Sequence, residues 1–276
     1  MVSQEQRRRQ LAREKFLRQQ QRRTQARRKA NVRNSVIASV LGVIVIGSVT
    51  LYTTGVLKGD DKKANAAADV TPSATPTSKA PDPCAKPAAG SVEKMSWKKE
   101  PAMTIDTSAK YSMKLATTCG DIDVALKTAA APHTVNSFNF LAGKGYFDHT
   151  KCHRLTTTGI YVLQCGDPQG TGMGGPGYTL PDENLKDKSL KANTYPAGTV
   201  AMANTGQKHT GGSQFFLVYK DSPLPPSYTP FGTVSDAGMK VLQKIAAAGA
   251  QAADPTSGNT APNATVVINK ATVTKS

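Results

Sequence analysis

Polar side chains interrupt two apolar segments in the second half of the chain, where residues 201–219 read AMANTGQKHTGGSQFFLVY. Asn204 and Gln214 lie close in sequence to Ala203 and Phe216. A buried amide without a hydrogen-bond partner costs about 1–3 kcal/mol, so a plain core strand would not place amides there. Amides can instead hold the backbone of a bound peptide. We therefore interpret this stretch as the wall of a binding groove.

The residues give weaker support to other kinds of chemistry. Ser213 lies in Gly-Gly-Ser-Gln-Phe, which lacks the second glycine of a G-x-S-x-G nucleophile elbow. Asp121 and Asp123 have strand spacing, but beside a turn such carboxylates are more often solvated caps than an acid and a base. Residues 170–177, GTGMGGPG, lack the G-x-x-x-x-G-K-S/T spacing of a phosphate loop. We interpret them as a flexible surface loop.

The first part of the chain differs from the rest in composition. Residues 1–34 form a basic arm with twelve Arg or Lys against two Glu, and this arm holds most of the net charge of +16. Residues 35–57 then contain no charged side chain and are long enough to cross a bilayer as a helix. Because basic residues beside a span stay in the cytoplasm, we expect a single-pass cell-membrane anchor with a cytoplasmic N-terminus and an extracytoplasmic domain.

A cleaved signal peptide is the alternative to this anchor, since residues 64–66 offer an A-x-A pattern. The apolar run is longer than the usual h-region of about 7–15 residues, which favours an uncleaved anchor. The arm has no aromatic residues interleaved with its charges for base stacking, so no nucleic-acid partner is expected. Residues 58–96 are rich in Ala, Thr and Pro and are predicted to be a linker.

Residues 97–276 remain for one folded domain, whose periodicity is mostly that of strands. A helix is predicted to begin at Pro132 and to stop at the glycines 143 and 145, and a second helix is predicted over 236–248. Strands are predicted over residues 111–116, 122–126, 152–155, 160–165, 198–203, 213–219, 230–234 and 264–274. Many strands with two helices indicate an antiparallel barrel or sandwich.

Four cysteines follow the predicted anchor, in the compartment where disulfides persist. Three pairings are possible. Cys152 and Cys165 fall on neighbouring predicted strands, so we pair them with each other and leave Cys84 to pair with Cys119. A metal site built from His149, Cys152, His153 and Cys165 is the alternative, but Cys152 and His153 are adjacent and would point to opposite faces of a strand. No metal is expected.

Five short motifs follow one another along the folded part of the chain. They are HR at 153–154, YVLQCGD at 161–167, MAN at 202–204, GSQFF at 212–216 and FG at 231–232. In their order and approximate spacing they resemble the cyclophilin family of peptidyl-prolyl cis-trans isomerases, over about residues 105–274. The resemblance implies an all-β fold, a closed eight-stranded antiparallel barrel capped by two α-helices, with the active groove on its outer face.

The resemblance also assigns roles to residues of this chain. Arg154 would be the catalytic residue, as the cationic donor to the prolyl nitrogen. The proline pocket would be lined by Tyr161, Val162, Phe216 and Leu224. The peptide backbone would be held, or the arginine oriented, by Gln164, Ala203, Asn204 and Gln214. Tyr228 falls where the family often has His or Tyr. The stretch after Arg154 is two residues longer than in many members, so Ile160 is an alternative to Tyr161.

The implied activity is rotation about X-Pro bonds in proline-containing polypeptides, without a cofactor. The other partner would be the cell membrane, through residues 35–57, and the protein is expected to be a monomer. The alternative function is a tethered peptide-binding module or holdase chaperone with little or no turnover, which would use the same groove.

Overall fold

The structure is a computed structural model that describes residues 81–254 and 258–276. The predicted basic arm, the predicted span at 35–57 and most of the predicted linker lie outside the described residues. Within the described part of the chain, no helix is both long and apolar enough to cross a membrane.

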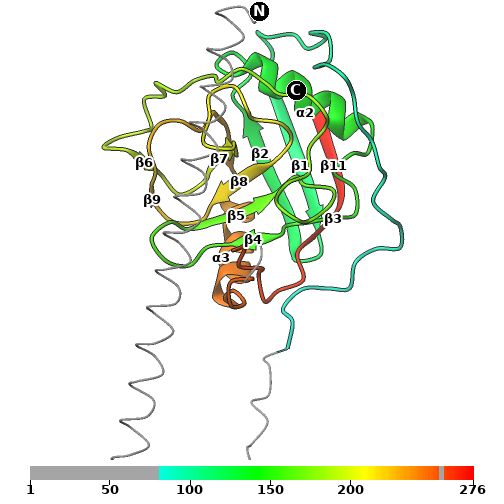
Figure 1. Cartoon of the computed structure of the whole chain (residues 1–276), viewed down its shortest axis with the longest axis vertical. Coiled ribbons are helices and arrows are strands. Elements are labelled where there is room, and N and C mark those ends of the chain that lie inside the picture. Colours follow the sequence, from blue (N-terminus) through cyan, green and yellow to red (C-terminus); the bar gives the residue numbers. More distant parts are fainter. Residues whose placement is uncertain (1–80, 255–257) are drawn as a thin grey trace, which may run out of the picture. The chain divides into compact units, whose positions relative to one another are not determined.

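One antiparallel sheet of nine strands dominates the described residues (Figure 1). Its order is β3 (Thr150–Lys151), β11 (Val267–Lys275), β1 (Tyr111–Thr117), β2 (Gly120–Leu126), β10 (Pro230–Val234), β7 (Thr199–Met202), β8 (Phe215–Val218), β5 (Val162–Cys165) and β4 (Arg154–Leu155). A second sheet pairs β6 (Thr194–Tyr195) with β9 (Ser222–Pro223). Two helices complete the described fold, α2 (Pro132–Gly143) and α3 (Asp236–Ala247).

The sheet is curled, because the two strands at its ends, β3 and β4, are consecutive in the sequence. Only Cys152 and His153 separate β3 from β4, although these strands stand at opposite ends of the sheet order. The strand predicted over 152–155 is shortened to β4, which pairs with β5, whereas β3 just before it pairs with β11. The predicted closed eight-stranded barrel is therefore corrected to a curled nine-stranded half-barrel. The all-β class and the two helices are confirmed.

Side chains cap the N-terminal ends of both helices. Pro132 opens α2, and the carboxylate of Glu183 accepts hydrogen bonds from the backbone N–H groups of His133 (3.0 Å) and Thr134 (2.9 Å). A carboxylate at this position also complements the positive end of the helix dipole. Ser235 caps α3 by accepting a hydrogen bond from the N–H of Gly238 at 3.1 Å.

Alternation along β8 divides the buried apolar side chains into two clusters. Phe215 and Leu217 point into the main core, which α2 and α3 cover, and Phe216 lies in a second cluster on the other face. The second cluster consists of Val162, Tyr195, Ala201, Phe216 and Val218. Because successive side chains of a strand point to opposite faces, one short strand serves both the core and the surface beneath the predicted groove.

Two disulfides fasten the domain, Cys84 to Cys119 and Cys152 to Cys165, which confirms the predicted pairing. The first one attaches a segment that we call the strap, residues 84–105. The strap runs along the side of the domain and joins β1 (Figure 1, cyan). Its residues 84–96 were assigned to the linker from their composition, but the structure places them on the domain, where the N–H of Ala85 donates to Thr118 O at 2.8 Å.

Candidate active site

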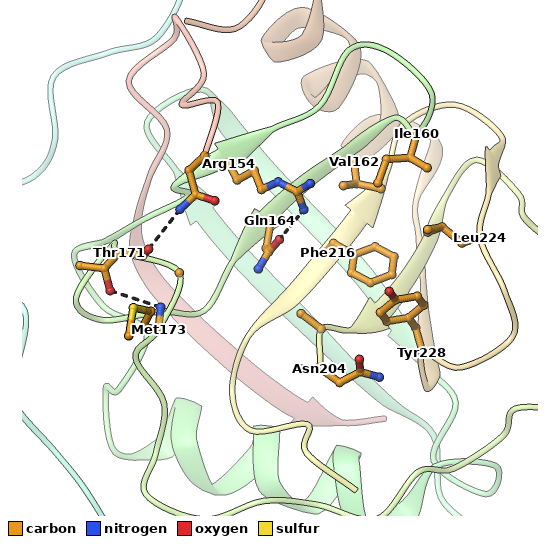
Figure 2. Close-up of a pocket in the computed structure, with 13 residues that line it drawn as sticks. Arg154, Ile160, Val162, Gln164, Thr171, Met173, Asn204, Phe216, Leu224 and Tyr228 are labelled. Atoms are coloured by element: carbon orange, nitrogen blue, oxygen red, sulfur yellow. Dashed lines mark hydrogen bonds between the residues drawn. The ribbon is translucent and has the colours of Figure 1, made fainter. Parts of the chain in front are cut away.

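A cavity of about 440 Å³ lies over the second apolar cluster, beside β4, β5, β7 and β8 (Figure 2). Eight of the ten predicted site residues line it: Arg154, Val162, Gln164, Ala203, Asn204, Phe216, Leu224 and Tyr228. Figure 2 shows the apolar residues on one side of the cavity and Thr171 and Met173 on the other, with Arg154 and Gln164 between them. The structure thus brings together residues that are up to 74 positions apart in the sequence.

Aromatic rings form the apolar end of the cavity. The ring of Phe216 lies edge-on to that of Tyr228, with 5.5 Å between centroids. Beneath them, the Tyr195 hydroxyl donates to Tyr228 O at 2.7 Å and accepts from Tyr228 N at 3.1 Å. Burial raises the pKa of Tyr195 to about 12, so this hydroxyl stays protonated. The rigid, apolar floor suits a small saturated ring such as that of proline.

Three hydrogen bonds in series fix the polar end. The Arg154 guanidinium donates through Nη1 to Gln164 Oε1 at 3.2 Å, and Gln164 Nε2 donates to Gln214 Oε1 at 2.8 Å. Gln214 Nε2 then donates to Gly174 O at 2.9 Å. Because each amide accepts from one neighbour and donates to the next, the direction of the whole series is determined. Gln214 does not line the cavity, and it supports Arg154 through Gln164.

The strands that carry these side chains are joined at the same level. Arg154 and Gln164 are cross-strand partners in β4 and β5, and Gln164 faces Phe216 across β5 and β8. The disulfide joins Cys165, which directly follows Gln164, to Cys152, which lies two residues before Arg154. The pairing of β4 with β5 and the nearby disulfide therefore fix the backbone at Arg154, and the amide of Gln164 orients its guanidinium.

Most donors of the guanidinium are available to a ligand. In residues 81–254 and 258–276, none of the ion pairs involves Arg154, and Gln164 is its one side-chain hydrogen-bond partner. Arg154 is half-buried at the cavity wall. A cation in this position can donate to an atom bound over the apolar floor.

Asn204 has a different role from the glutamines, since its side chain connects two surface loops. Its Nδ2 donates to Ser227 O at 2.8 Å, and its Oδ1 accepts from the N–H of Gly206 at 2.9 Å. Its neighbour Ala203 is tied to β8 by a hydrogen bond from Ala203 N to Gln214 O at 2.9 Å. These bonds hold the wall that the sequence predicted around residues 203 and 204.

The glycine-rich loop that follows β5 folds around a buried carboxylate. Asp167 has no exposed surface. Its Oδ1 accepts from Gln169 N at 2.7 Å, and its Oδ2 accepts from Thr171 N at 3.0 Å, Gly172 N at 2.6 Å and Met173 N at 3.1 Å. Burial alone would raise the pKa of this carboxyl, but the backbone N–H donors outweigh burial and lower it. Residues 170–177 form a surface loop, as predicted, and these bonds hold the backbone of its residues 171–173.

Ile160 was named from the sequence as the alternative to Tyr161, and four other lining residues were missed. Ile160 occupies the wall where Tyr161 was predicted, and Tyr161 instead packs edge-on against Tyr219, with 5.9 Å between ring centroids. Thr171, Gly172 and Met173 come from the loop around Asp167, and Asn259 comes from the segment before β11. Only the loop had a sequence signal, its glycine content, and no periodic pattern marks Asn259.

Three other reactive side chains, Ser213, Asp121 and His153, do not line this cavity. Ser213 is fully buried, donates to Gly166 O at 2.7 Å and lies 3.0 Å from the Tyr146 hydroxyl. Asp121 is exposed and pairs with Lys114 at 2.8 Å. His153 is buried with both ring nitrogens unpartnered, and burial lowers its pKa, which favours the neutral ring.

Comparisons with known proteins agree with this geometry. A family model described as "Cyclophilin type peptidyl-prolyl cis-trans isomerase/CLD" matches residues 112–273. The "Probable peptidyl-prolyl cis-trans isomerase B" of Mycobacterium leprae is 48% identical over 149 residues, which cover 51% of this chain and 50% of that protein. The "Peptidyl-prolyl cis-trans isomerase B" of Bacillus subtilis is 43% identical over 115 residues, 41% of this chain and 76% of that protein.

A crystal structure of a cyclophilin type peptidyl-prolyl cis-trans isomerase from Cryptosporidium parvum superimposes with a TM-score of 0.48 and 27% identity, over 60% of this chain and 99% of that chain. The chain spans about half the length of the mycobacterial relatives that it matches.

Proposed function

The chain belongs to the family of cyclophilin-type peptidyl-prolyl cis-trans isomerases, and from this membership we propose that it accelerates rotation about X-Pro bonds in proline-containing polypeptides. The observation that carries the proposal is the position of Arg154. Its guanidinium is oriented by Gln164 at 3.2 Å, beside an apolar cavity formed by Phe216, Leu224 and Tyr228.

The reaction requires no nucleophile, because no covalent bond is broken. Resonance gives the C–N bond partial double-bond character and a rotation barrier of about 18–20 kcal/mol. In the twisted transition state this conjugation is lost, and the prolyl nitrogen regains a lone pair that can accept a hydrogen bond. A donor aimed at that nitrogen therefore binds the twisted state more tightly than either planar state, which is the condition for catalysis.

The residues of the cavity divide this task. The apolar floor around Phe216 binds the prolyl ring and excludes water. Arg154 donates to the prolyl nitrogen as it becomes pyramidal, and Gln164 and Gln214 keep the guanidinium in position. The wall at Ala203 holds the backbone of the substrate, so that rotation occurs on one side of the fixed ring.

The test is a peptide isomerisation assay, followed by NMR exchange on an Ala-Pro peptide, with the full chain in detergent. A hydrogen bond to a charged donor contributes about 1.5–3 kcal/mol, and each 1.36 kcal/mol is a factor of ten in rate. Arg154→Ala should therefore lower kcat/KM by about 10- to 100-fold. Lys151→Ala removes an exposed cation from the neighbouring strand β3 and should leave the rate unchanged.

The same assay separates catalysis from binding alone. If the wild-type chain isomerises the peptide at the uncatalysed rate but still binds it, the catalytic proposal fails and the tethered peptide-binding module or holdase remains. If Arg154→Ala retains the wild-type rate, the role given to the guanidinium is wrong even though the chain is an enzyme.

We further propose that this domain works outside the cell membrane, as a monomer anchored through residues 35–57. Two disulfides in the described domain support an oxidising compartment, because such bonds seldom persist in the cytosol. Protease added to intact cells should degrade the domain and spare the basic arm. Protection of the domain until the cells are opened would contradict this location.

A further inference from the structure

A second cavity, of about 1040 Å³, continues the groove beyond the amide series. It shares five lining residues with the first cavity, Gln164, Gly172, Met173, Ala203 and Asn204, so the two form one continuous groove. Its outer rim is formed by three residues of the strap, Lys98, Lys99 and Glu100. These three precede residues 112–273, which the family model matches.

The strap is held against the domain on both sides of these rim residues. On one side, Trp97 N donates to Pro176 O at 2.8 Å, and the Trp97 ring packs edge-on against Phe140 of α2 with 5.1 Å between centroids. On the other side, Asn136 of α2 accepts from Thr104 N at 3.0 Å. The rim is therefore a fixed wall of the groove.

The backbone of the strap also fits closely over the glycine-rich loop. A Cβ added to Gly177 would lie 2.3 Å from Ser96 Oγ and 2.7 Å from Trp97 O, and the residue has a φ of +90°. Only glycine satisfies both the conformation and the contact. The position of the strap thus depends on Gly177 of the glycine-rich loop, the same loop whose Gly174 O accepts a hydrogen bond from Gln214.

The charge on this rim is positive. Lys98 and Lys99 are exposed and take part in none of the ion pairs of the described residues. The carboxylate of Glu100 lies 3.3 Å from His133 Nδ1, and these two residues and Lys99 also line a separate small cavity on the α2 side of the strap. All other residues that line the large cavity are uncharged. A ligand in the groove therefore meets two cations, Lys98 and Lys99, and one carboxylate, that of Glu100, so the net charge of the rim is positive.

We propose that Lys98 and Lys99 determine substrate specificity, by selecting proline-containing peptides that carry an acidic side chain outside the X-Pro pair. This inference rests on the proposed isomerase function and adds a substrate class to it. The prolyl ring occupies the apolar cavity, the backbone crosses the amide series, and a Glu or Asp side chain reaches the strap. Arg154 stays with the prolyl nitrogen, and the two lysines act on the distant part of the peptide.

The experiment compares peptides that differ in one charge. Each peptide contains one Ala-Pro pair and one Glu, and the Glu occupies a different position in each peptide, from four residues before the proline to three after it, outside the Ala-Pro pair. A matched peptide with Gln in place of Glu is the control for each. An exposed ion pair contributes up to about 1 kcal/mol, a factor of about five. With the full chain, kcat/KM at the preferred position should be about two- to fivefold higher for Glu than for Gln, and salt should reduce the difference.

Charge reversal should invert this preference. Lys98→Glu with Lys99→Glu should make the Gln peptide the better substrate, whereas Lys94→Glu, an exposed lysine of the strap that lines none of these cavities, should behave like the wild type. The fluorescence of Trp97, the one tryptophan of the chain, verifies that the strap remains in place in each variant.

The outcomes separate the two proposals. If the wild type isomerises every peptide but discriminates Glu from Gln at no position, or if Lys94→Glu changes the preference as much as the double variant does, the role of the strap is overturned. If the wild type isomerises no peptide, the proposed isomerase function itself has failed.

Discussion

Replacing Asp167 by Asn tests whether one buried carboxylate organises the loop beside the groove. Its two oxygens accept N–H groups from Gln169, Thr171, Gly172 and Met173, at 2.6 to 3.1 Å. Asparagine keeps one acceptor oxygen, and its NH₂ group then faces at least one N–H donor. The change removes at least one charge-assisted bond, about 1.5–3 kcal/mol, and leaves a buried donor unpaired. We expect a loss of about 2–4 kcal/mol in the free energy of unfolding at pH 7.

Urea unfolding of the full chain, followed by Trp97 fluorescence, measures this loss. Trp97 is the one tryptophan of the chain and bonds to Pro176 at the end of the same loop. Asp106→Asn is the matched control, because Asp106 also accepts a backbone N–H, that of Ser108 at 3.0 Å, but on an exposed turn. The control should change the unfolding midpoint far less than Asp167→Asn does.

Acidification supplies the second arm of the test. Although burial alone would raise it, the pKa of Asp167 is lowered by the backbone N–H groups in the folded state. The carboxylate therefore contributes its stability in full above its ordinary pKa near 3.8 and loses it as the pH falls through the lower folded value. The difference between wild type and Asp167→Asn should shrink below about pH 4. A difference under about 1 kcal/mol at pH 7 would refute the argument.

Three further predictions concern the strap, the cross-link and the buried histidine. Gly177→Ala should displace the strap, because the new Cβ would lie 2.7 Å from Trp97 O; a red shift of Trp97 emission and a loss of about 1–3 kcal/mol in urea unfolding are expected. Cys152→Ala with Cys165→Ala should lower the free energy of unfolding by about 2–4 kcal/mol, measured in urea against the oxidised wild type. Burial lowers the pKa of His153, so wild-type stability should fall as the pH drops below 6.5 towards the folded pKa, and His153→Leu should lose this dependence in unfolding curves from pH 7 to 5.

The sequence predicted the parts of the fold whose pattern is local. The helix predicted over 236–248 is observed as α3, and the strands predicted over 111–116 and 122–126 are observed as β1 and β2, because apolar periodicity acts over a few positions. The disulfide between Cys152 and Cys165 was also predicted, since both cysteines fall on neighbouring predicted strands, although Cys152 itself lies between β3 and β4 in the structure. Six of the eight predicted cavity residues lie in the short motifs that carry the family resemblance, and the resemblance itself supplied the other two, Leu224 and Tyr228.

What the sequence did not predict depends on contacts between distant segments. In the lengthened loop after Arg154, apolar periodicity does not determine which side chain faces the cavity. Tyr161 was therefore predicted to line the cavity, whereas Ile160 lines it. Residues 84–96 have the composition of a linker, and only their partners on the domain make them a wall. Asn259 reaches the cavity through a hydrogen bond to Thr171 O at 3.1 Å, which no local pattern encodes.

The seam between β3 and β4, residues 152–155, is bonded to a segment near the C-terminus, which is synthesised late. At this seam Cys152 N donates to Val266 O at 3.0 Å, and Leu155 N donates to Thr260 O at 2.7 Å. These two hydrogen bonds lie directly before and directly after Arg154 and its neighbour His153. The partners lie among the last 20 residues of the chain. A ribosome adds residues from the N-terminus, so the arginine is made more than 100 residues before the segment that completes its surroundings. These two backbone bonds beside Arg154 can thus form only after the C-terminal segment has been synthesised.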